Sequence, residues 1–197
     1  MIILNLRIVE ESANDPTTLL HYGSIPIAFM VTSWYSVHAV DRGLGGLILT
    51  EESVNEPYIK DYDAYAGEGP TRWATSFDLS HWGLLGAFAG NTRIGGAVIA
   101  WNTPGVDMLD GRDDLAVLWD LRVHPNFRGR GVGGRLFATG ETWARSRGAK
   151  ELKVETQNIN VPACRFYAAH GCELRTIRHG AYVDFPEEVQ LLWHKNL

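Results

Sequence analysis

A glycine- and arginine-rich turn, placed between a strand pattern and a helix pattern, has the chemistry to bind a phosphate group. Residues 115–123 read Leu-Ala-Val-Leu-Trp-Asp-Leu-Arg-Val and predict a strand, and residues 128–135 read Arg-Gly-Arg-Gly-Val-Gly-Gly-Arg. Glycines let the backbone approach a ligand closely, and N–H groups at the start of a helix face anions. Arg128, Arg130 and Arg135 add positive charge. The turn is therefore a candidate pyrophosphate cradle.

The spacing of the turn excludes two well-known phosphate loops. A P-loop has Lys followed by Ser or Thr after its last glycine, whereas Gly134 is followed by Arg135. The dinucleotide pattern G-x-G-x-x-G is also absent from this stretch. The pattern Arg128-x-x-Gly131-x-Gly133, preceded by Val123-x-Pro125, resembles the acetyl-CoA-binding motif of the GNAT acetyltransferase superfamily.

A second segment is similar to another signature of that superfamily, Asn-x-x-Ala-x-x-x-Tyr-x-x-x-Gly. Asn160 stands where a helix N-cap belongs, Pro162 falls in the first turn, and Gly171 ends the helix. The aromatic residue that usually follows the last glycine is replaced by Cys172. Two signatures in the right order indicate the superfamily much more strongly than either one alone.

Four further segments resemble streptothricin acetyltransferases: residues 56–62, 154–157, 163–167 and 185–189. This resemblance covers roughly residues 25–195. We therefore predict an N-terminal extension of uncertain role at residues 1–24 and a GNAT acetyltransferase domain at residues 25–197.

The resemblance implies an α/β fold in which helices flank a mixed, mostly antiparallel, twisted sheet in a single domain. It also implies acetyl-CoA as the acetyl donor, with the Val123 N–H as a donor to the oxyanion. The residues that it assigns to acetyl-CoA binding are Leu121, Arg122, Val123, Arg128, Gly129, Arg130, Gly131, Val132, Gly133, Gly134, Asn160 and Tyr167.

Acetyl transfer to an amine needs a base for the amine and a proton donor for the departing thiolate. Asp120 is the first candidate base, and the alternative for it is an ion pair with Arg122, two residues along the same strand face. Glu155 is the second candidate base, and its alternative is a solvated strand residue. Tyr167 is the candidate proton donor, and its alternative is a core aromatic residue on its helix.

The acceptor side is less clearly marked. Residues 51–68 hold six acidic side chains and one basic one, Lys60. An acidic lip would attract a cationic amine such as streptothricin, and a solvated acidic face is the alternative. The aromatic residues that we name as candidates for lining the acceptor site are Tyr58, Tyr62, Trp101 and Trp119.

Length, charge and cysteine spacing restrict the class of protein and its cellular location. A chain of 197 residues with net charge −5 fits one globular domain and argues against a general nucleic-acid binder. Cys164 and Cys172 flank one helix about 12 Å apart, too far for a disulfide, which favours reduced cysteines and a cytoplasmic location. No apolar run reaches membrane-spanning length, and no histidine spacing predicts a metal site. The sequence leaves open whether the chain forms a homodimer.

The elements expected along the chain alternate between strands and helices. We expect strands near residues 1–7, 27–37, 44–50, 84–89, 94–101, 115–123, 152–156, 174–177 and 189–193. We expect helices over residues 57–64, from Val132 to Gly148, and from Asn160 to Gly171, with a loop at residues 67–70. Two other functions compete with the small-amine acetyltransferase: acetylation of a peptide or protein N-terminus or lysine, and non-catalytic acyl-CoA sensing.

Overall fold

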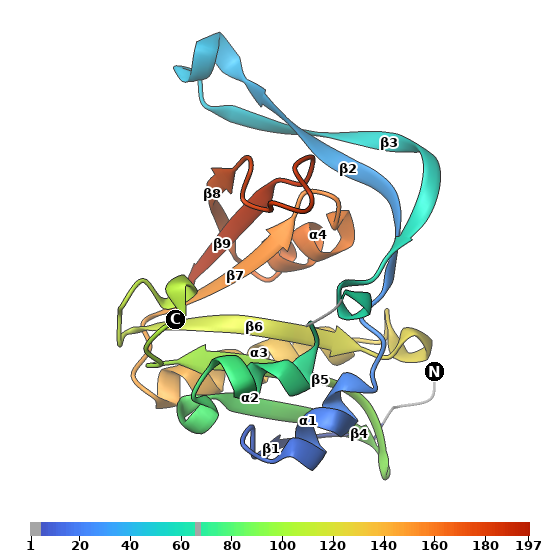
Figure 1. Ribbon diagram of the computed structural model, residues 1–197, viewed down its shortest axis with the longest axis vertical. Helices are drawn as coiled ribbons and strands as arrows, with labels where there is room; N and C mark the ends of the chain where they lie inside the picture. The colour runs from blue at the N-terminus through green and yellow to red at the C-terminus, as the bar shows by residue number, and fades with distance from the viewer. Residues whose placement is uncertain (1–4, 66–67) are drawn as a thin grey trace. The chain divides into compact units, whose positions relative to one another are not determined.

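The computed structural model describes residues 5–65 and 68–197, which form two compact units (Figure 1). The first unit contains the described residues up to 27, residues 61–154 and residues 195–197. The second unit contains residues 28–60 and 155–194.

The first unit is built on a sheet in the order β1-β4-β5-β6-β7. Its strands are β1 (Leu6–Glu11), β4 (Gly83–Ala89), β5 (Thr92–Trp101), β6 (Leu115–Val123) and the first four residues of β7 (Glu151–Gln157). All neighbours are antiparallel except β6 and β7, which pair in parallel from Leu115↔Glu151 to Leu118↔Val154. This is the mixed, mostly antiparallel sheet that we predicted.

Two adjacent glycines of β5 show how helices cover both faces of this sheet. A Cβ atom on Gly96 would lie 2.5 Å from the Tyr22 ring of α1 (Pro16–Gly23). A Cβ atom on Gly95 would lie 3.2 Å from Leu136 of α3 (Val132–Ser146). Because successive strand residues point to opposite faces, α1 and α3 lie on opposite sides of the sheet, as Figure 1 shows. Next to α1 lies α2 (Pro70–Ser76).

The N-terminal residues, whose role the sequence left open, contribute to the core of the first unit. Of the strand expected at residues 1–7, residues 1–4 lie outside the described part, and β1 begins at Leu6. The helix α1, which we did not predict, begins after Asp15, whose carboxylate accepts hydrogen bonds from the N–H groups of Thr17 and Thr18. Its Leu19 and Tyr22 are fully buried.

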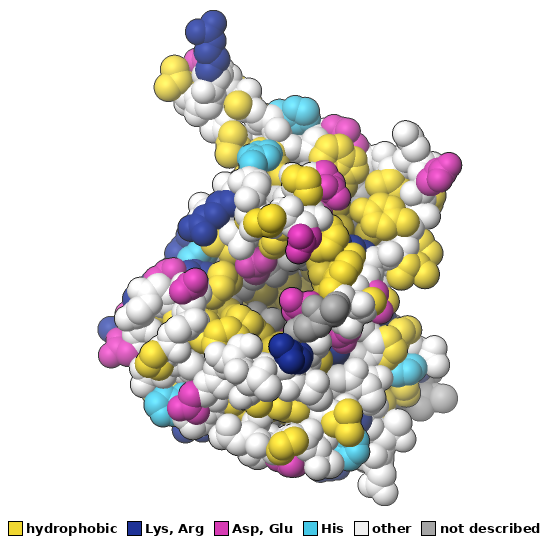
Figure 2. Space-filling model, in the orientation of Figure 1, with side chains coloured by type: hydrophobic (Ala, Val, Ile, Leu, Met, Phe, Trp, Pro, Cys, Tyr) yellow, Lys and Arg dark blue, Asp and Glu magenta, His cyan; other side chains and the backbone are white. Residues whose placement is uncertain are grey.

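The second unit combines a long hairpin with a smaller sheet. The hairpin pairs β2 (Phe29–Ala39) with β3 (Leu47–Lys60), and the sheet continues from β7 to β9 (Gln190–Asn196) and β8 (Glu173–Arg178). The helix α4 (Val161–Ala169) completes the unit. Hydrophobic side chains are exposed around the hairpin tip (Figure 2), namely Val40, Leu44, Leu47 and Ile48.

The helix expected over residues 57–64 is wrong. Pro57 lies within β3, and only Tyr62–Ala64 forms a short 3-10 turn. Between Val31↔Tyr58 and Ser33↔Ser53 the register shifts, so that residues 54–57 face a single residue of β2. A bulge of this kind needs no ladder hydrogen bond from proline, which explains why proline is tolerated in this strand.

The strand expected at residues 44–50 is also too short, since β3 continues to Lys60, and α2 was not predicted. The remaining expected strands and helices agree with the structure within a few residues. Further 3-10 turns lie at Val40–Gly43, Leu79–His81, Asp107–Leu109 and Pro125–Phe127. Of the loop expected at residues 67–70, residue 67 lies outside the described part, and Pro70 already begins α2. Cys164 and Cys172 are buried and form no disulfide. Among the described residues, no helix is both long and apolar enough to cross a membrane, and no group of three or more His, Cys, Asp or Glu side chains is placed to hold a metal ion.

Candidate active site

The turn before α3 has the backbone geometry of an anion cradle. Gly129 and Gly131 have φ angles of +70° and +80°, a region that glycine adopts without strain. A Cβ atom on either residue would meet nothing within 4 Å, so the space beside the turn is open to a ligand. Gly131 is the N-cap of α3 and provides no side-chain cap. The N–H groups of the first helical turn therefore have no capping side chain, which fits a pyrophosphate group.

The arginines of the turn also shape its backbone. Arg128 donates from Nε to the Val123 carbonyl at 2.9 Å and from Nη2 to the Pro26 carbonyl at 3.1 Å. Arg135 donates to the Leu6 carbonyl at 3.3 Å, and the Arg130 guanidinium lies 5.6 Å from the centre of the Phe127 ring. Through its two hydrogen bonds Arg128 holds the end of β6 against the segment before β2.

The end of β6 presents backbone groups on the edge away from β5. The His124 N–H donates to Ile94 at the start of β5, at 2.8 Å. Because peptide groups alternate along a strand, those of Leu121 and Val123 point away from β5. The ladder between β6 and β7 ends earlier, at Leu118↔Val154. These peptide groups are thus placed to bind the amide groups of an extended ligand.

Asp120 forms the ion pair with Arg122 that the sequence analysis named as its alternative. Oδ2 of Asp120 accepts from Nη2 of Arg122 at 2.5 Å, and Oδ1 accepts from Nε at 3.0 Å. Oδ1 also accepts from the Tyr22 hydroxyl at 2.7 Å. Arg122 donates further to Asp63 Oδ2 at 2.6 Å and to the Ile25 carbonyl at 3.2 Å. Both carboxylate oxygens of Asp120 are therefore engaged.

Burial and charge fix the protonation states of this cluster. Burial alone would lower the pKa of the Arg122 guanidinium, but the charge and hydrogen bonds of Asp120 raise it overall. Burial raises the pKa of the Tyr22 phenol well above its usual value, and the nearby charge of Asp120 raises it further. Tyr22 is thus a neutral donor and Arg122 a permanent cation.

Glu155, in the second unit, has neutral partners instead. Its Oε1 accepts from the Tyr182 hydroxyl at 2.7 Å, and its Oε2 accepts from Gln190 Nε2 at 2.7 Å. Gln157 Nε2 lies 3.1 Å from the Tyr182 hydroxyl. Burial, followed by the charge of Glu155, raises the pKa of Tyr182. Glu155 is therefore hydrogen-bonded and half-buried rather than a solvated strand residue.

Asn160 and Tyr167 lie on α4 as the sequence predicts. The Asn160 Oδ1 accepts from the Ala163 N–H at 3.2 Å, which confirms the N-cap. Tyr167 is buried, with 7% of its surface exposed, and its ring packs edge-to-face against Phe166 at 5.2 Å. Both the core role and the proton-donor role of Tyr167 are compatible with this placement.

The acidic residues at positions 51–68 are divided between the two units. Glu51, Glu52 and Glu56 lie along β3, whereas Asp61, Asp63 and Glu68 belong to the first unit. Several also have internal partners: Glu51 pairs with Arg165, Glu52 accepts from Ser36 at 2.5 Å, and Asp63 pairs with Arg122. Much of this acidic charge is therefore used in internal contacts.

The four candidate aromatic residues are also divided between the two units. Trp119 packs against Phe77 and Trp82 in the first unit, at ring distances of 5.3 and 5.1 Å. Trp101 donates to the Asp113 carbonyl at 2.8 Å. Tyr58 is 44% exposed on β3 of the second unit, and Tyr62 is half-buried in the first.

Two of the sequence segments that resemble streptothricin acetyltransferases meet in the second unit. Lys60, at the end of β3, donates to Glu188 Oε1 at 2.5 Å, and both side chains are about 5% exposed or less. The Lys60 Nζ also lies 3.4 Å from the centre of the Phe185 ring. This contact anchors the segment between β8 and β9, which carries Tyr182, to the hairpin.

With this geometry in place, comparison with known proteins decides the family. Residues 47–172 match the Acetyltransferase (GNAT) family. The chain belongs to this family. A streptothricin acetyltransferase of Escherichia coli is 30% identical over 171 residues, which cover 84% of each chain. Streptothricin acetyltransferase A of Bacillus subtilis is 29% identical over 152 residues, covering 74% of this chain and 77% of that one.

Solved structures agree on the fold of this GNAT enzyme. A Bacillus anthracis protein assigned as a streptothricin acetyltransferase, solved in complex with acetyl coenzyme A, aligns with a TM-score of 0.75 at 23% identity. The alignment covers 98% of this chain and 100% of that one. The predicted GNAT fold and the prediction of an acetyltransferase that uses acetyl-CoA are confirmed.

Several polar residues of the GNAT chain that contact the candidate bases were not predicted from the sequence. Tyr22 and Asp63 join the Asp120 cluster, and Tyr182 and Gln190 join Glu155. Tyr22 lies in the stretch that the resemblance did not cover. Tyr182 is separated from Glu155 by 27 residues, and no local pattern indicates that they meet.

Proposed function

We propose that this GNAT enzyme transfers the acetyl group of acetyl-CoA to a primary amine of a small cationic acceptor of the streptothricin type. The observation that carries the proposal is the 30% identity with the Escherichia coli streptothricin acetyltransferase across 84% of both chains. The Lys60–Glu188 contact supports it, because it gives two of the shared sequence segments a common structural role.

Acetyl-CoA supplies the thioester that makes its acetyl carbon electrophilic. In this proposal the backbone from Arg128 to Gly134 and the start of α3 at Val132 hold its pyrophosphate. The peptide groups of Leu121 and Val123 bind its extended arm, and the Val123 N–H stabilises the developing oxyanion. Arg122 holds the strand in place at this point, and Asn160 keeps its cap role beside the ligand.

Two side chains carry the proton transfers. Tyr167 donates a proton or a hydrogen bond to the leaving sulfur, because a neutral phenol is a suitable donor at neutral pH. For the amine's proton we favour Glu155 over Asp120. Both oxygens of Asp120 already accept hydrogen bonds from Arg122, so a proton added there would disrupt a buried ion pair.

The cysteines support a cytoplasmic location for the enzyme. Cys164 and Cys172 are buried and form no disulfide, which fits a reducing compartment. We place the enzyme in the cytoplasm, where acetyl-CoA is made and used.

A panel of acceptors tests the proposal. The full chain is incubated with acetyl-CoA, and release of the CoA thiol is followed with streptothricin, spermidine, an aminoglycoside and a peptide with a free N-terminus. We expect kcat/KM for streptothricin to exceed that for the peptide by at least about 100-fold, or about 2.7 kcal/mol in transition-state binding. A preference for the peptide would assign the enzyme to protein acetylation instead. Thiol release with none of the acceptors, despite stabilisation by acetyl-CoA in a thermal-shift assay, would favour an acyl-CoA sensor.

A further inference from the structure

The described side chains that contact Glu155 are neutral hydrogen-bond donors. Tyr182 and Gln190 donate to its two carboxylate oxygens, each at 2.7 Å. Within residues 5–65 and 68–197, no Lys, Arg or His side chain pairs with Glu155. Its negative charge is thus held by neutral donors in a half-buried position, where a cationic ligand can still reach it.

Gln190 has an acceptor atom that no described group satisfies. Its Nε2 must face Glu155, because only the amide nitrogen can donate to a carboxylate. That orientation leaves Oε1, which is buried and has no hydrogen-bond partner. Buried polar atoms without partners are rare in proteins, so this oxygen indicates a ligand with an N–H or O–H donor.

The two faces of β7 have different neighbours in this region. Thr156 points to the face covered by α4, where its hydroxyl lies 3.3 Å from Cys164 Sγ and accepts from Trp193 at 2.8 Å. Glu155 and Gln157 alternate with it and therefore point to the opposite face. That face is the one that meets Tyr182, from the segment between β8 and β9.

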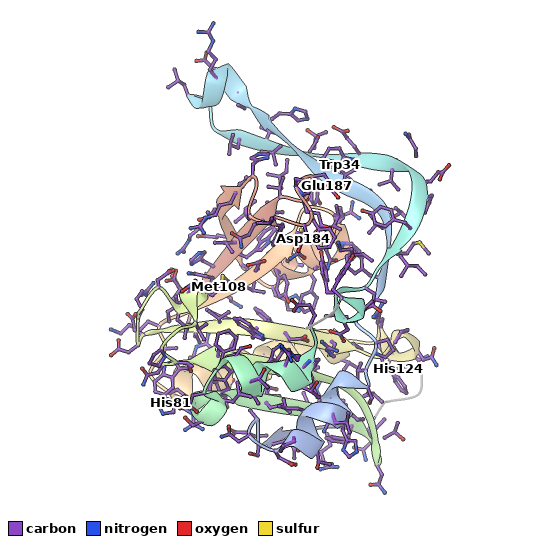
Figure 3. The ribbon with its side chains drawn as sticks, in the orientation of Figure 1. Trp34, His81, Met108, His124, Asp184 and Glu187 are labelled. Atoms are coloured by element: carbon purple, nitrogen blue, oxygen red, sulfur yellow. The ribbon has the colours of Figure 1, made fainter. Side chains whose placement is uncertain are left out.

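The segment that carries Tyr182 is itself acidic and anchored. Asp184 and Glu187, labelled in Figure 3, are exposed on it. The buried contact of Lys60 with Glu188 and Phe185 holds the same segment. A cation approaching Glu155 would thus pass negative charge on a segment that is fixed in position.

We propose that Glu155, Tyr182 and Gln190 form the subsite for the ammonium group of the acceptor, which rests on the proposed function. An ammonium group carries three N–H donors. It would donate to Glu155 and to Gln190 Oε1, and Tyr182 acts as a positioning residue that orients the Glu155 carboxylate. The ammonium then gives one proton to Glu155. The resulting amine forms the C–N bond to the acetyl carbon as the C–S bond breaks, and Tyr167 gives its proton to the departing sulfur. The nitrogen then loses its second proton, which replaces the one given by Tyr167, and Glu155 releases the first proton to water.

The test measures streptothricin binding by titration calorimetry, and turnover by thiol release, for the wild type and three variants. Gln190→Leu removes the unpartnered oxygen, Tyr182→Phe removes only the hydroxyl, and Glu173→Gln is a matched control that removes an exposed carboxylate of the same unit. We expect Gln190→Leu to weaken streptothricin binding about 10-fold and leave the KM for acetyl-CoA within about twofold. We expect Tyr182→Phe to lower kcat more than it raises the acceptor KM and to shift the acidic limb of the pH–rate profile, which a purely structural role would not move. Glu173→Gln should match the wild type.

The possible results distinguish a failure of the proposed subsite from a failure of the proposed function. Turnover of streptothricin with unchanged binding by Gln190→Leu would overturn the subsite and leave the function standing. Binding that Gln190→Leu weakens, without turnover by the wild type, would overturn the function and support the subsite. Neither binding nor turnover by a folded wild-type enzyme would overturn both. If Gln190→Leu fails to fold, as judged by its thermal transition, Gln190→Met has a shape closer to that of glutamine and also removes the oxygen. It is expected to weaken streptothricin binding about 10-fold, and unchanged binding would overturn the subsite.

Discussion

Asp120 and Glu155 are the same kind of acid on two paired strands, but their partners differ in charge. Asp120, on β6, is bound by the guanidinium of Arg122 through both oxygens and is 8% exposed. Glu155, on β7, is bound by a phenol and an amide and is half-buried. The comparison teaches that the partner, rather than the residue type or strand position, distinguishes a carboxylate held in an ion pair from the carboxylate that we propose as the base.

The energetic reason lies in what each carboxylate loses when it takes up a proton. A hydrogen bond in which either partner is ionised is about twice as strong as one between neutral groups, so both carboxylates lose charge-assisted hydrogen bonds, and the difference lies in the charge of the partner. Protonating Asp120 would leave Arg122 with an uncompensated charge in a buried position, where its side chain is 1% exposed. Protonating Glu155 disturbs only hydrogen bonds from neutral donors. Glu155 can therefore exchange a proton in each turnover at lower cost.

The largest expected effect compares the two acids directly. Glu155→Gln should lower kcat by about 10²–10⁴-fold, because the amide cannot accept the amine's proton. Asp120→Asn should lower kcat by less than about tenfold in the folded protein. Steady-state kinetics at saturating acetyl-CoA, with the folded fraction of each variant measured by circular dichroism, check both values. The reverse order of the two variants would make Asp120 the base.

The next effect is on stability. Arg122→Met removes the cation shared by Asp120 and Asp63 and should lower the free energy of unfolding by about 3–5 kcal/mol, because it leaves buried charge without a partner. Urea denaturation measures the change. The double variant Asp120→Asn, Arg122→Met should regain at least about 1 kcal/mol, since one of the stranded charges is then removed. If the double variant is as unstable as the sum of the single ones, the pair contributes no coupling.

A smaller effect tests whether the proton donor acts together with the base. Tyr167→Phe keeps the ring and should lower kcat about 10–10³-fold with little change in the acceptor KM. In a double-mutant cycle, its effect should add to that of Asp120→Asn but fall short of additivity with Glu155→Gln. Full activity in Tyr167→Phe would leave this residue only a core role.

The smallest effect concerns the face of β7 away from Glu155. Burial raises the pKa of the Cys164 thiol from 9.0 to about 11, although the hydrogen bond with Thr156 opposes this. Because the unfolded thiol ionises first, its contribution to stability is complete below about pH 9 and is lost as the pH rises through about 11. We expect the wild type to lose about 2 kcal/mol more than Cys164→Ala between pH 8 and pH 11. Parallel denaturation curves would contradict the burial of this thiol.

Elements with strong local signals could be predicted from the sequence. The strand ending at Val123, the turn with Gly131 and the helix capped by Asn160 each carry their cause within a few residues, as positive φ angles and a capping side chain show. Pro57 shows where a local signal misleads, because proline suits both the first turn of a helix and a strand bulge. Only the register with β2 distinguishes them.

The candidate site was less predictable because its decisive contacts are distant in sequence. Asp120 meets Tyr22 across 98 residues, and Glu155 meets Gln190 across 35. A strand pattern predicts that Asp120 and Arg122 share a face, so their ion pair was foreseeable as an alternative. It carries no information about which phenol or amide the fold brings to each acid.

The contacts of Arg122 also have a consequence for how this enzyme can diversify. Its Nη1 donates both to the Ile25 carbonyl and to Asp63, so one guanidinium joins the two ends of the stretch that contains the β2–β3 hairpin. The residues between them therefore leave and re-enter the first unit at two points that the same side chain of β6 holds, and a change in their length need not move that strand.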